Sequence, residues 1–219
     1  MKVNKECESC QQRLGLWALI ASLFLSLVKG VVGILGSSEA LVADGLCSFY
    51  QSFVVVNSIF YMRNSEKTPP IYKSIWFAGL VISAMLILGT GDVVIFSVVR
   101  IAKAAKGLLV RPSPYALYSA ILSVLANQLL YRYSLCLGKE MPETSGWVTD
   151  ITQSLRFSVI VSCIVVIGIG VARIVSLYGD AIAALIVAAI LIPKVVDLLN
   201  ESWKQQPIGN YTGLQGHKA

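Results

Sequence analysis

Long apolar segments recur six times along the chain, and short polar stretches connect them. They cover approximately residues 14–35, 40–62, 74–99, 115–137, 147–173 and 180–199. A helix needs about 20 apolar residues to cross the ~30 Å hydrocarbon core of a bilayer. Each segment is long enough to do so. The sequence therefore predicts an all-α fold, a polytopic membrane protein with six transmembrane helices.

Composition and charge agree with this fold class. The chain is 56% hydrophobic and 14% charged, with a net charge of +6. Lys and Arg gather at the ends of membrane spans and orient them, so contact with membrane lipid explains the positive charge and no nucleic-acid partner is expected. The five Cys residues are dispersed, unlike the regular disulfide framework of small secreted proteins. We expect neither structural disulfides nor a cleavable signal peptide.

Six spans place both termini on one side of the membrane. If that side is cytoplasmic, eleven Lys and Arg residues lie in the cytoplasmic segments and six in the opposite ones, an excess that predicts cytoplasmic termini. The domain organisation is then a cytoplasmic tail at 1–13, a six-helix domain at 14–200 and a short cytoplasmic tail at 201–219. Three basic residues on the opposite side, Arg100, Lys103 and Lys106, share one helical face and are expected to contact lipid head groups.

Polar residues gather on one side of the second apolar segment. At 3.6 residues per turn, Asp44, Cys47, Ser48 and Gln51 fall on one helical stripe. Polar groups are costly in hydrocarbon, so such a stripe should face other helices or a water-filled path. We expect any function to be located here. Asp92, in the third segment, is a second acidic candidate, which is either functional or paired with a base near the interface.

Two stretches resemble motifs of the cation diffusion facilitator family, transporters that exchange divalent metal ions for protons. Residues 29–53, KGVVGILGSSEALVADGLCSFYQSF, resemble the pattern K...G...GS.ALLADALHS..D, and residues 179–203 resemble G.DPIAALLIA.LIL....LL.ES. The matching residues are Lys29, Gly33, Gly36, Ser38, Ala40, Leu41, Ala43, Asp44, Ser48, Asp180, Ala183, Ala184, Leu185, Glu201 and Ser202. The resemblance implies divalent-cation transport and a homodimer, or a heterodimer with another facilitator.

Within the family, the chain looks most similar to the magnetosome-membrane members. The observations are the CxxC near the N-terminus, the stretch LYRYSLCLGKE at 130–140 and the overall spacing. This resemblance implies a multi-pass protein of the magnetosome or bacterial inner membrane, associated with iron. Most family members carry a cytoplasmic ferredoxin-like domain after the sixth span. Fewer than twenty residues follow Glu201 here, so we expect that domain to be lacking.

The resemblance also locates the four metal ligands of the family. The second-helix pair falls on Cys47 and Gln51. The fifth-span pattern, A..DA.H.R.DA.SS, read without gaps over WVTDITQSLRFSVIVS, places the other pair at Thr152 and Arg156. Sites for Zn²⁺ or Fe²⁺ use several carboxylates, imidazoles or thiolates. A thiol, an amide, a hydroxyl and a guanidinium do not match that chemistry.

Electrostatics argues against a metal at these positions. A unit positive charge about 4 Å from a divalent ion costs on the order of 8 kcal/mol at an effective dielectric of 20, and Arg does not deprotonate in proteins. We therefore expect a degenerate site in which Arg156 pairs with Asp44. The alternative is that Arg156 faces a water-filled cavity alone. Lys29, near the end of the first span, is expected to extend its ammonium to the interface.

Two Cys residues near the N-terminus form one further candidate metal site. Cys7 and Cys10 form a CxxC, which supplies two of the four ligands of a structural zinc site. Two copies across a dimer could complete such a site; otherwise these are ordinary reduced thiols. Cys136 and Cys163 are expected to be packing residues.

Three function classes remain for comparison. The first is a divalent-cation transporter, with Fe or Zn as the possible ion and Asp44, Asp92 and Cys47 along a modified path. The second is a transport-incompetent relative that serves an active facilitator as scaffold or regulator, and the site chemistry favours it. The third, an enzyme, is not expected, because His217 is the single His and no nucleophile–base pair is visible. No resident cofactor is predicted; the divalent metal is considered only as a transported ion.

Overall fold

A computed structural model describes residues 5–63, 71–106, 111–140 and 145–204; at several helix ends it describes the backbone but not the side chains. These residues form six helices: α1 (Lys5–Leu35), α2 (Glu39–Arg63), α3 (Ile71–Ala105), α4 (Pro114–Glu140), α5 (Ser145–Ile174) and α6 (Gly179–Lys204). Among the residues so described there is no strand, which confirms the all-α prediction.

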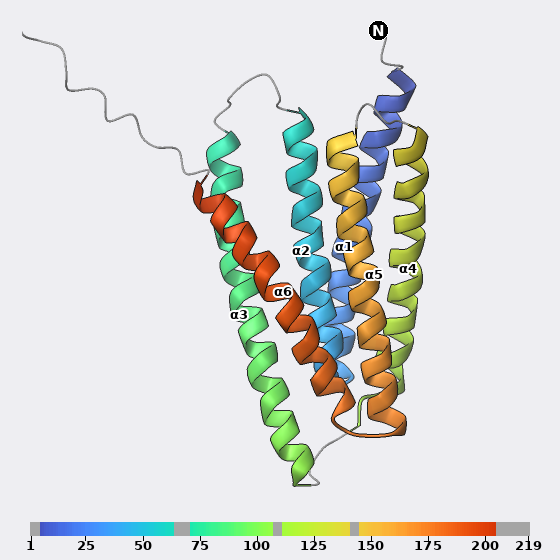
Figure 1. The fold of residues 1–219 in the computed structure, drawn as a ribbon, viewed down its shortest axis with the longest axis vertical. Coiled ribbons are helices and arrows are strands. Elements are labelled where there is room, and N and C mark those ends of the chain that lie inside the picture. The colour runs from blue at the N-terminus through green and yellow to red at the C-terminus, as the bar shows by residue number, and fades with distance from the viewer. Residues whose placement is uncertain (1–4, 64–70, 107–110, 141–144, 205–219) are drawn as a thin grey trace, which may run out of the picture.

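The helices run up and down, with α3 and α6 set to one side of the other four (Figure 1). Helix α1 packs mainly against α2, α4 against α5, and α3 against α6. Helix α6 crosses obliquely and also contacts α2 and α5. Helix α1 begins and α6 ends at the same end of the bundle, called here the terminal end. The α1–α2 and α5–α6 connections lie at the other end, called the turn end.

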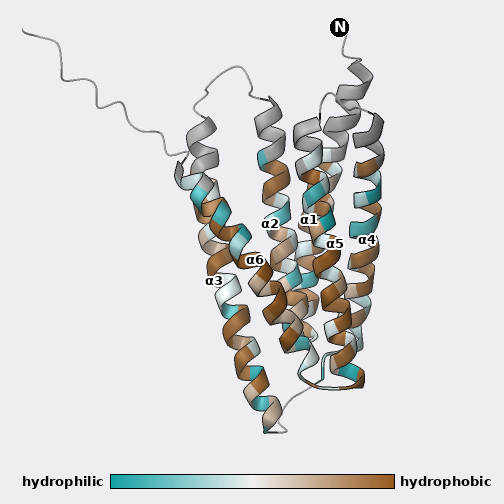
Figure 2. Ribbon diagram, in the orientation of Figure 1, coloured by the Kyte–Doolittle hydropathy of each residue, from teal (hydrophilic) through white to brown (hydrophobic). Residues whose placement is uncertain are grey.

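The outer surface is suited to lipid. Five described segments, at 15–35, 39–57, 77–105, 151–174 and 179–200, are long and apolar enough to cross a membrane. Hydrophobic residues extend along these helices in Figure 2. Large apolar side chains such as Phe24, Ile34 and Leu88 are more than half exposed, and in water such a surface would aggregate. The chain is therefore a polytopic membrane protein. Helix α4 is the least apolar of the six because it carries Asn127, Gln128 and Arg132.

Small residues allow the helices to approach closely, as is common in membrane bundles. A Cβ at Gly45 of α2 would lie 3.1 Å from the backbone nitrogen of Gly30 on α1. A Cβ at Gly168 of α5 would overlap the side chain of Ala183 on α6. These two glycines fix α2 against α1 and α6 against α5. They thereby determine which side chains of α2 and α5 face the interior.

A polar cluster joins three helices at the turn end. Ser38 caps α2, since its Oγ accepts a hydrogen bond from the Leu41 N–H at 3.3 Å. The same hydroxyl donates to Asp180 Oδ1 of α6 at 2.6 Å, and the Glu39 N–H donates to Oδ2 at 2.9 Å. Arg100 of α3 completes the cluster at 2.9 Å from Asp180 and 3.5 Å from Glu39. The expectation that Arg100 contacts lipid head groups is thus wrong, whereas Lys103 and Lys106 are exposed.

Candidate functional site

The polar stripe of α2 meets α1 and α5 at a buried ion pair. Asp44 Oδ2 lies 3.0 Å from Lys29 Nζ, and both side chains have no exposed surface. Lys29 also donates to Ser48 Oγ at 2.8 Å and to Ser162 Oγ at 3.3 Å. An ammonium has three donors, so all three of its protons have an oxygen partner. This is the condition under which a charge can be buried without a large penalty.

Two predictions about these residues are wrong. Lys29 does not extend to the interface, because Asp44 lies within reach on the adjacent helix. Asp44 does not pair with Arg156 either, since Lys29 is its ion-pair partner and Ser162 Oγ lies 3.0 Å from each of its oxygens. A fixed cation does sit beside Asp44, as expected. It comes from α1 and not from α5.

A network of small polar groups extends from this pair into α4. Asn127 Nδ2 donates to Ser158 Oγ at 3.1 Å and to Ser162 Oγ at 3.2 Å. Ser123 Oγ lies 3.3 Å from Ser162 Oγ. All of these side chains are buried. No motif in the sequence marks this network, although Ser158 and Ser162 lie four residues apart and so face the same way along α5.

The four degenerate site positions differ in their surroundings. Cys47 and Gln51 are buried on α2, at 1% and 2% exposure. Thr152 is partly exposed and Arg156 is exposed. Helix α5 buries Leu155, Ser158 and Ser162 against the bundle. The structure therefore brings Cys47 and Gln51 to the interior, but not Arg156.

The direction of Arg156 follows from helical periodicity. Residues 156, 160 and 167 fall within about 40° of one another around a helix that advances 100° per residue. Ile160 and Ile167 are 50% and 65% exposed, so this stripe forms the outer surface of α5. Thr152 lies next to the same stripe. The register used to assign Thr152 and Arg156 thus selects the outward face of the helix.

Gln51 is unusual among the buried polar residues. Neither its amide nitrogen nor its carbonyl oxygen has a hydrogen-bond partner, although its side chain is 2% exposed. A buried unsatisfied polar group costs about 1–3 kcal/mol, and native proteins usually avoid it. A polar group retained at such a cost is a candidate contact for water or a ligand.

The remaining candidates do not join this site. Asp92 is exposed and takes part in none of the ion pairs found among the described residues. Cys163 lies with apolar residues of α4 and α5 such as Ile121 and Leu125, as a packing residue does. The side chains of Cys7, Cys10 and Cys136 lie outside the described residues. Across the described part of the chain, no three His, Cys, Asp or Glu residues are grouped so as to hold a metal ion.

Comparison with known proteins gives the family. The sequence model of the cation efflux transmembrane domain matches residues 16–205, a range that extends from α1 to the end of α6. The chain belongs to the cation diffusion facilitator family. Members of this family are transporters and not enzymes, which confirms the expectation that the chain is not an enzyme.

Several relatives can be named. The chain is 28% identical over 195 residues to magnetosome protein MamB of Magnetospirillum gryphiswaldense, an alignment that covers 85% of this chain and 63% of MamB. It is 30% identical over 207 residues to the manganese efflux system protein MneP of Bacillus subtilis, covering 90% and 69%. Magnetosome protein MamM of M. gryphiswaldense is 25% identical over 140 residues, covering 61% and 43%. The chain spans just under two thirds of the MamB relative, and the alignment supports the predicted likeness to magnetosome-membrane members.

Proposed function

We propose that this chain is a subunit of the magnetosome membrane that serves divalent-cation, and specifically iron, transport through a partner facilitator without carrying the ion itself. The observation that carries the proposal is the chemistry around Asp44 and Gln51. The one carboxylate on the inner stripe of α2 already holds an ammonium. The two ligand positions on that stripe offer a thiol and an amide.

An alternative alignment of the fifth-helix motif also places residues that suit a metal poorly at the ligand positions. Moved two residues along the chain, the family pattern A..DA.H.R.DA.SS matches its Arg with Arg156 and its last Ser with Ser162. The ligand positions are then Ser154 and Ser158, and Ser158 is buried beside Asn127. We prefer this register because it uses the inner face of α5. Either register supplies hydroxyls or a guanidinium where a metal site needs carboxylates or imidazoles.

The partner is proposed to be another facilitator of the same membrane, in a heterodimer, or a second copy of the chain. The name and the 28% identity of MamB support the magnetosome location and, indirectly, iron. Cytoplasmic termini remain a proposal, based on the distribution of Lys and Arg.

Divalent-cation transport by the chain itself is the second candidate. The 30% identity to a protein named for manganese efflux favours it. The transported cation would then have to pass Asp44 after Lys29 had moved away from it, or pass the thiol of Cys47.

Uptake into proteoliposomes separates the two candidates. The purified chain should not accumulate Fe²⁺, Zn²⁺ or Mn²⁺. A repaired chain with Cys47→His, Gln51→Asp, Ser154→His and Ser158→Asp should accumulate at least one of them, because it restores ligands on the inner faces of α2 and α5. A matched control with the same α2 changes plus Thr152→His and Arg156→Asp should stay silent, since those positions face outward. Metal uptake by the natural chain would refute the proposal and favour the second candidate.

A second measurement addresses the partner. Co-expression of the chain with MamB, followed by affinity purification through a tag on either protein, should recover both in one detergent-soluble complex. Uptake of Fe²⁺ by proteoliposomes that contain MamB should then differ with and without this chain. Recovery of the chain alone, with unchanged uptake, would leave the scaffold role without support.

A further inference from the structure

An apolar groove lies between α4 and α5 on the outer surface of the bundle. Its volume is about 260 Å³, and it is lined by Ile121, Val124, Leu125, Cys163, Val166 and Ile167. Leu125 and Ile167 are 57% and 65% exposed, so the groove is open to the surroundings. Residues 151–174 of α5 are apolar enough to cross a membrane, and those surroundings are therefore lipid. The occupant that such a groove fits is an acyl chain.

A second apolar groove lies on the other side of α5, against α6. Its volume is about 290 Å³, and its lining includes Ile164 and Ile167 of α5 and Ile182 of α6. Ile167 lines both grooves and so forms a ridge between them. The second groove reaches Gly179, the first residue of α6, at the turn end. Two grooves on either side of one ridge match the two acyl chains of a glycerophospholipid.

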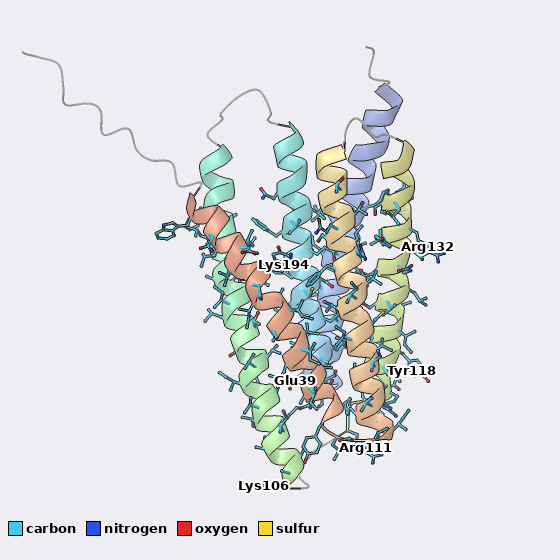
Figure 3. The ribbon with its side chains drawn as sticks, viewed as in Figure 1. Glu39, Lys106, Arg111, Tyr118, Arg132 and Lys194 are labelled. Carbon is cyan, nitrogen blue, oxygen red and sulfur yellow. The ribbon has the colours of Figure 1, made fainter. Side chains whose placement is uncertain are left out.

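Two arginines lie at the turn end near these grooves. Arg173 follows Val166 by seven residues, which is two helical turns, about 10 Å along nearly the same face of α5. Its guanidinium donates to the carbonyl of Pro112 at 2.9 Å, and Pro112 directly follows Arg111, which is exposed. Figure 3 shows Arg111 at the turn end of the bundle. A guanidinium has several N–H donors, so Arg173 keeps donors for a further oxygen ligand.

The acids described at the turn end do not neutralise these arginines. Glu39 and Asp180 both pair with Arg100. None of the ion pairs among the described residues includes Arg111 or Arg173. An anionic head group therefore meets two cations here. The ammonium of a zwitterionic lipid would meet the same two cations and no unpaired acid among the described residues of this end.

Tyr118 indicates the depth of the first groove in the membrane. It lies three residues before Ile121 and seven before Leu125, which places it on the same stripe of α4, nearer to the turn end. Its side chain is 69% exposed, and Figure 3 shows it on α4. Tyrosines are enriched at membrane–water interfaces. The groove thus begins just below the head-group level and extends into the hydrocarbon, as an acyl chain does.

We propose that α4, α5 and α6 form a binding site for one anionic glycerophospholipid of the leaflet at the turn end. Arg111 and Arg173 bind its phosphate, and its two acyl chains lie in the grooves on either side of Ile167. Basic pockets between transmembrane helices recognise lipid head groups in this way. The site goes beyond the proposed function and does not depend on it, because no ion has to cross the membrane for the lipid to bind.

Tryptophan quenching by brominated lipids tests this inference. Tyr118→Trp places a reporter beside the first groove, in a background whose four native Trp residues are replaced by Phe. The protein is reconstituted in mixtures of phosphatidylglycerol and phosphatidylcholine, with bromine on the acyl chains of one lipid or of the other. The two quenching curves give the binding constant of phosphatidylglycerol relative to phosphatidylcholine. It should be at least about five, the factor that one basic residue near the surface contributes, and it should fall as salt is added.

Variants separate the head-group contact from the groove. Arg111→Gln with Arg173→Gln should bring the relative constant close to one, whereas Lys at both positions should keep most of the preference. The matched control, Lys103→Gln with Lys106→Gln, removes two exposed charges from α3 and should leave the constant unchanged. Cys163→Phe fills the first groove without altering a charge and should also bring the constant close to one. Each variant is first checked for its helical circular dichroism and its elution as a single species.

Three results would overturn the inference. The first is equal binding of the two lipids by the protein with both arginines. The second is a preference that persists when both arginines are replaced by Gln. The third is a preference that Cys163→Phe leaves intact, since the lipid would then be attracted by charge without a seat in the groove. The salt titration of Tyr118→Trp tests the charge contribution even where the Gln variant does not fold.

Discussion

Two lysines of this protein lie within segments apolar enough to cross a membrane, and their surroundings differ greatly. Lys29 has no exposed surface, with Asp44, Ser48 and Ser162 around its ammonium at 2.8 to 3.3 Å. Lys194 is exposed, and its described contact is the ring of Phe157 at 6.0 Å. The difference shows that an ammonium can be buried where oxygens replace all of its water. Where no such oxygens surround the ammonium, as at Lys194, the side chain stays exposed.

The largest loss of stability is expected when the buried Lys29–Asp44 ion pair is broken. Lys29→Met should destabilise the protein by about 3–5 kcal/mol, because it leaves Asp44 as a buried carboxylate without its counter-charge. The measurement is the free energy of unfolding in mixed micelles, by titration with denaturing detergent.

The double variant Lys29→Met with Asp44→Leu is the control for this prediction. It should be more stable than Lys29→Met alone, since it removes the unpaired charge together with its partner. Equal stability of the single and double variants would mean that the two side chains do not act as a pair.

The polar cluster around Asp180 at the turn end is partly exposed, and its disruption should cause an intermediate loss of stability. Asp180→Ala removes the acceptor for Ser38, the Glu39 N–H and Arg100, and should cost about 2–3 kcal/mol, because hydrogen bonds to charged groups are the stronger ones. The same unfolding titration measures it. Lys103→Ala, which removes an exposed charge from α3, serves as the control and should leave stability unchanged; a loss equal to that of Asp180→Ala would contradict the assignment.

Replacement of Gln51, whose amide has no hydrogen-bond partner, should not destabilise the protein. Gln51→Leu is expected to leave stability unchanged or to raise it by about 1 kcal/mol, because it removes a buried group that has no hydrogen-bond partner. Asn127→Leu is the matched comparison, since it removes an amide that bonds Ser158 and Ser162. It should destabilise by about 1–3 kcal/mol. If Gln51→Leu proves as damaging as Asn127→Leu, Gln51 has a partner within the folded protein.

The smallest change in stability is expected at Arg156, the residue predicted from the sequence to pair with Asp44. Arg156→Leu should leave the unfolding titration and the yield of membrane-inserted protein as they are, because Arg156 is exposed beside Ile160 and Ile167. A loss of stability as large as that of Lys29→Met would show that Arg156 reaches Asp44 after all.

Much of the fold could be predicted from the sequence, and part of the site as well. The six helices follow from the length of the apolar segments, and the family follows from the motifs around Asp44 and Asp180. The Lys29–Asp44 pair was also within reach of the sequence. Lys29 lies eight residues before the Ser37 turn and Asp44 seven residues after it, so an antiparallel α1–α2 pair brings them to one level.

The orientation of α5 could not be predicted in the same way. In water, a helix shows its inner face by an apolar stripe. In a membrane the outer face is apolar too, so Ile160 and Ile167 outside and Val161 and Val165 inside carry the same signal. The rotation of α5 is decided by contacts between helices, such as the close approach of Gly168 to Ala183 and the hydrogen bonds of Ser158 and Ser162.

The sequence by itself thus determined that the chain is a polytopic, all-α membrane protein and that it belongs to the cation diffusion facilitator family. It also predicts that Cys47 and Gln51 stand at two of the family's ligand positions. Only the tertiary structure decided which polar groups meet. It gave Asp44 the ammonium of Lys29, turned Arg156 outward and buried Gln51 without a hydrogen-bond partner. The physical reason is that hydrophobicity sets which segments enter the bilayer, whereas hydrogen bonds and close packing between helices set how each helix is rotated within it.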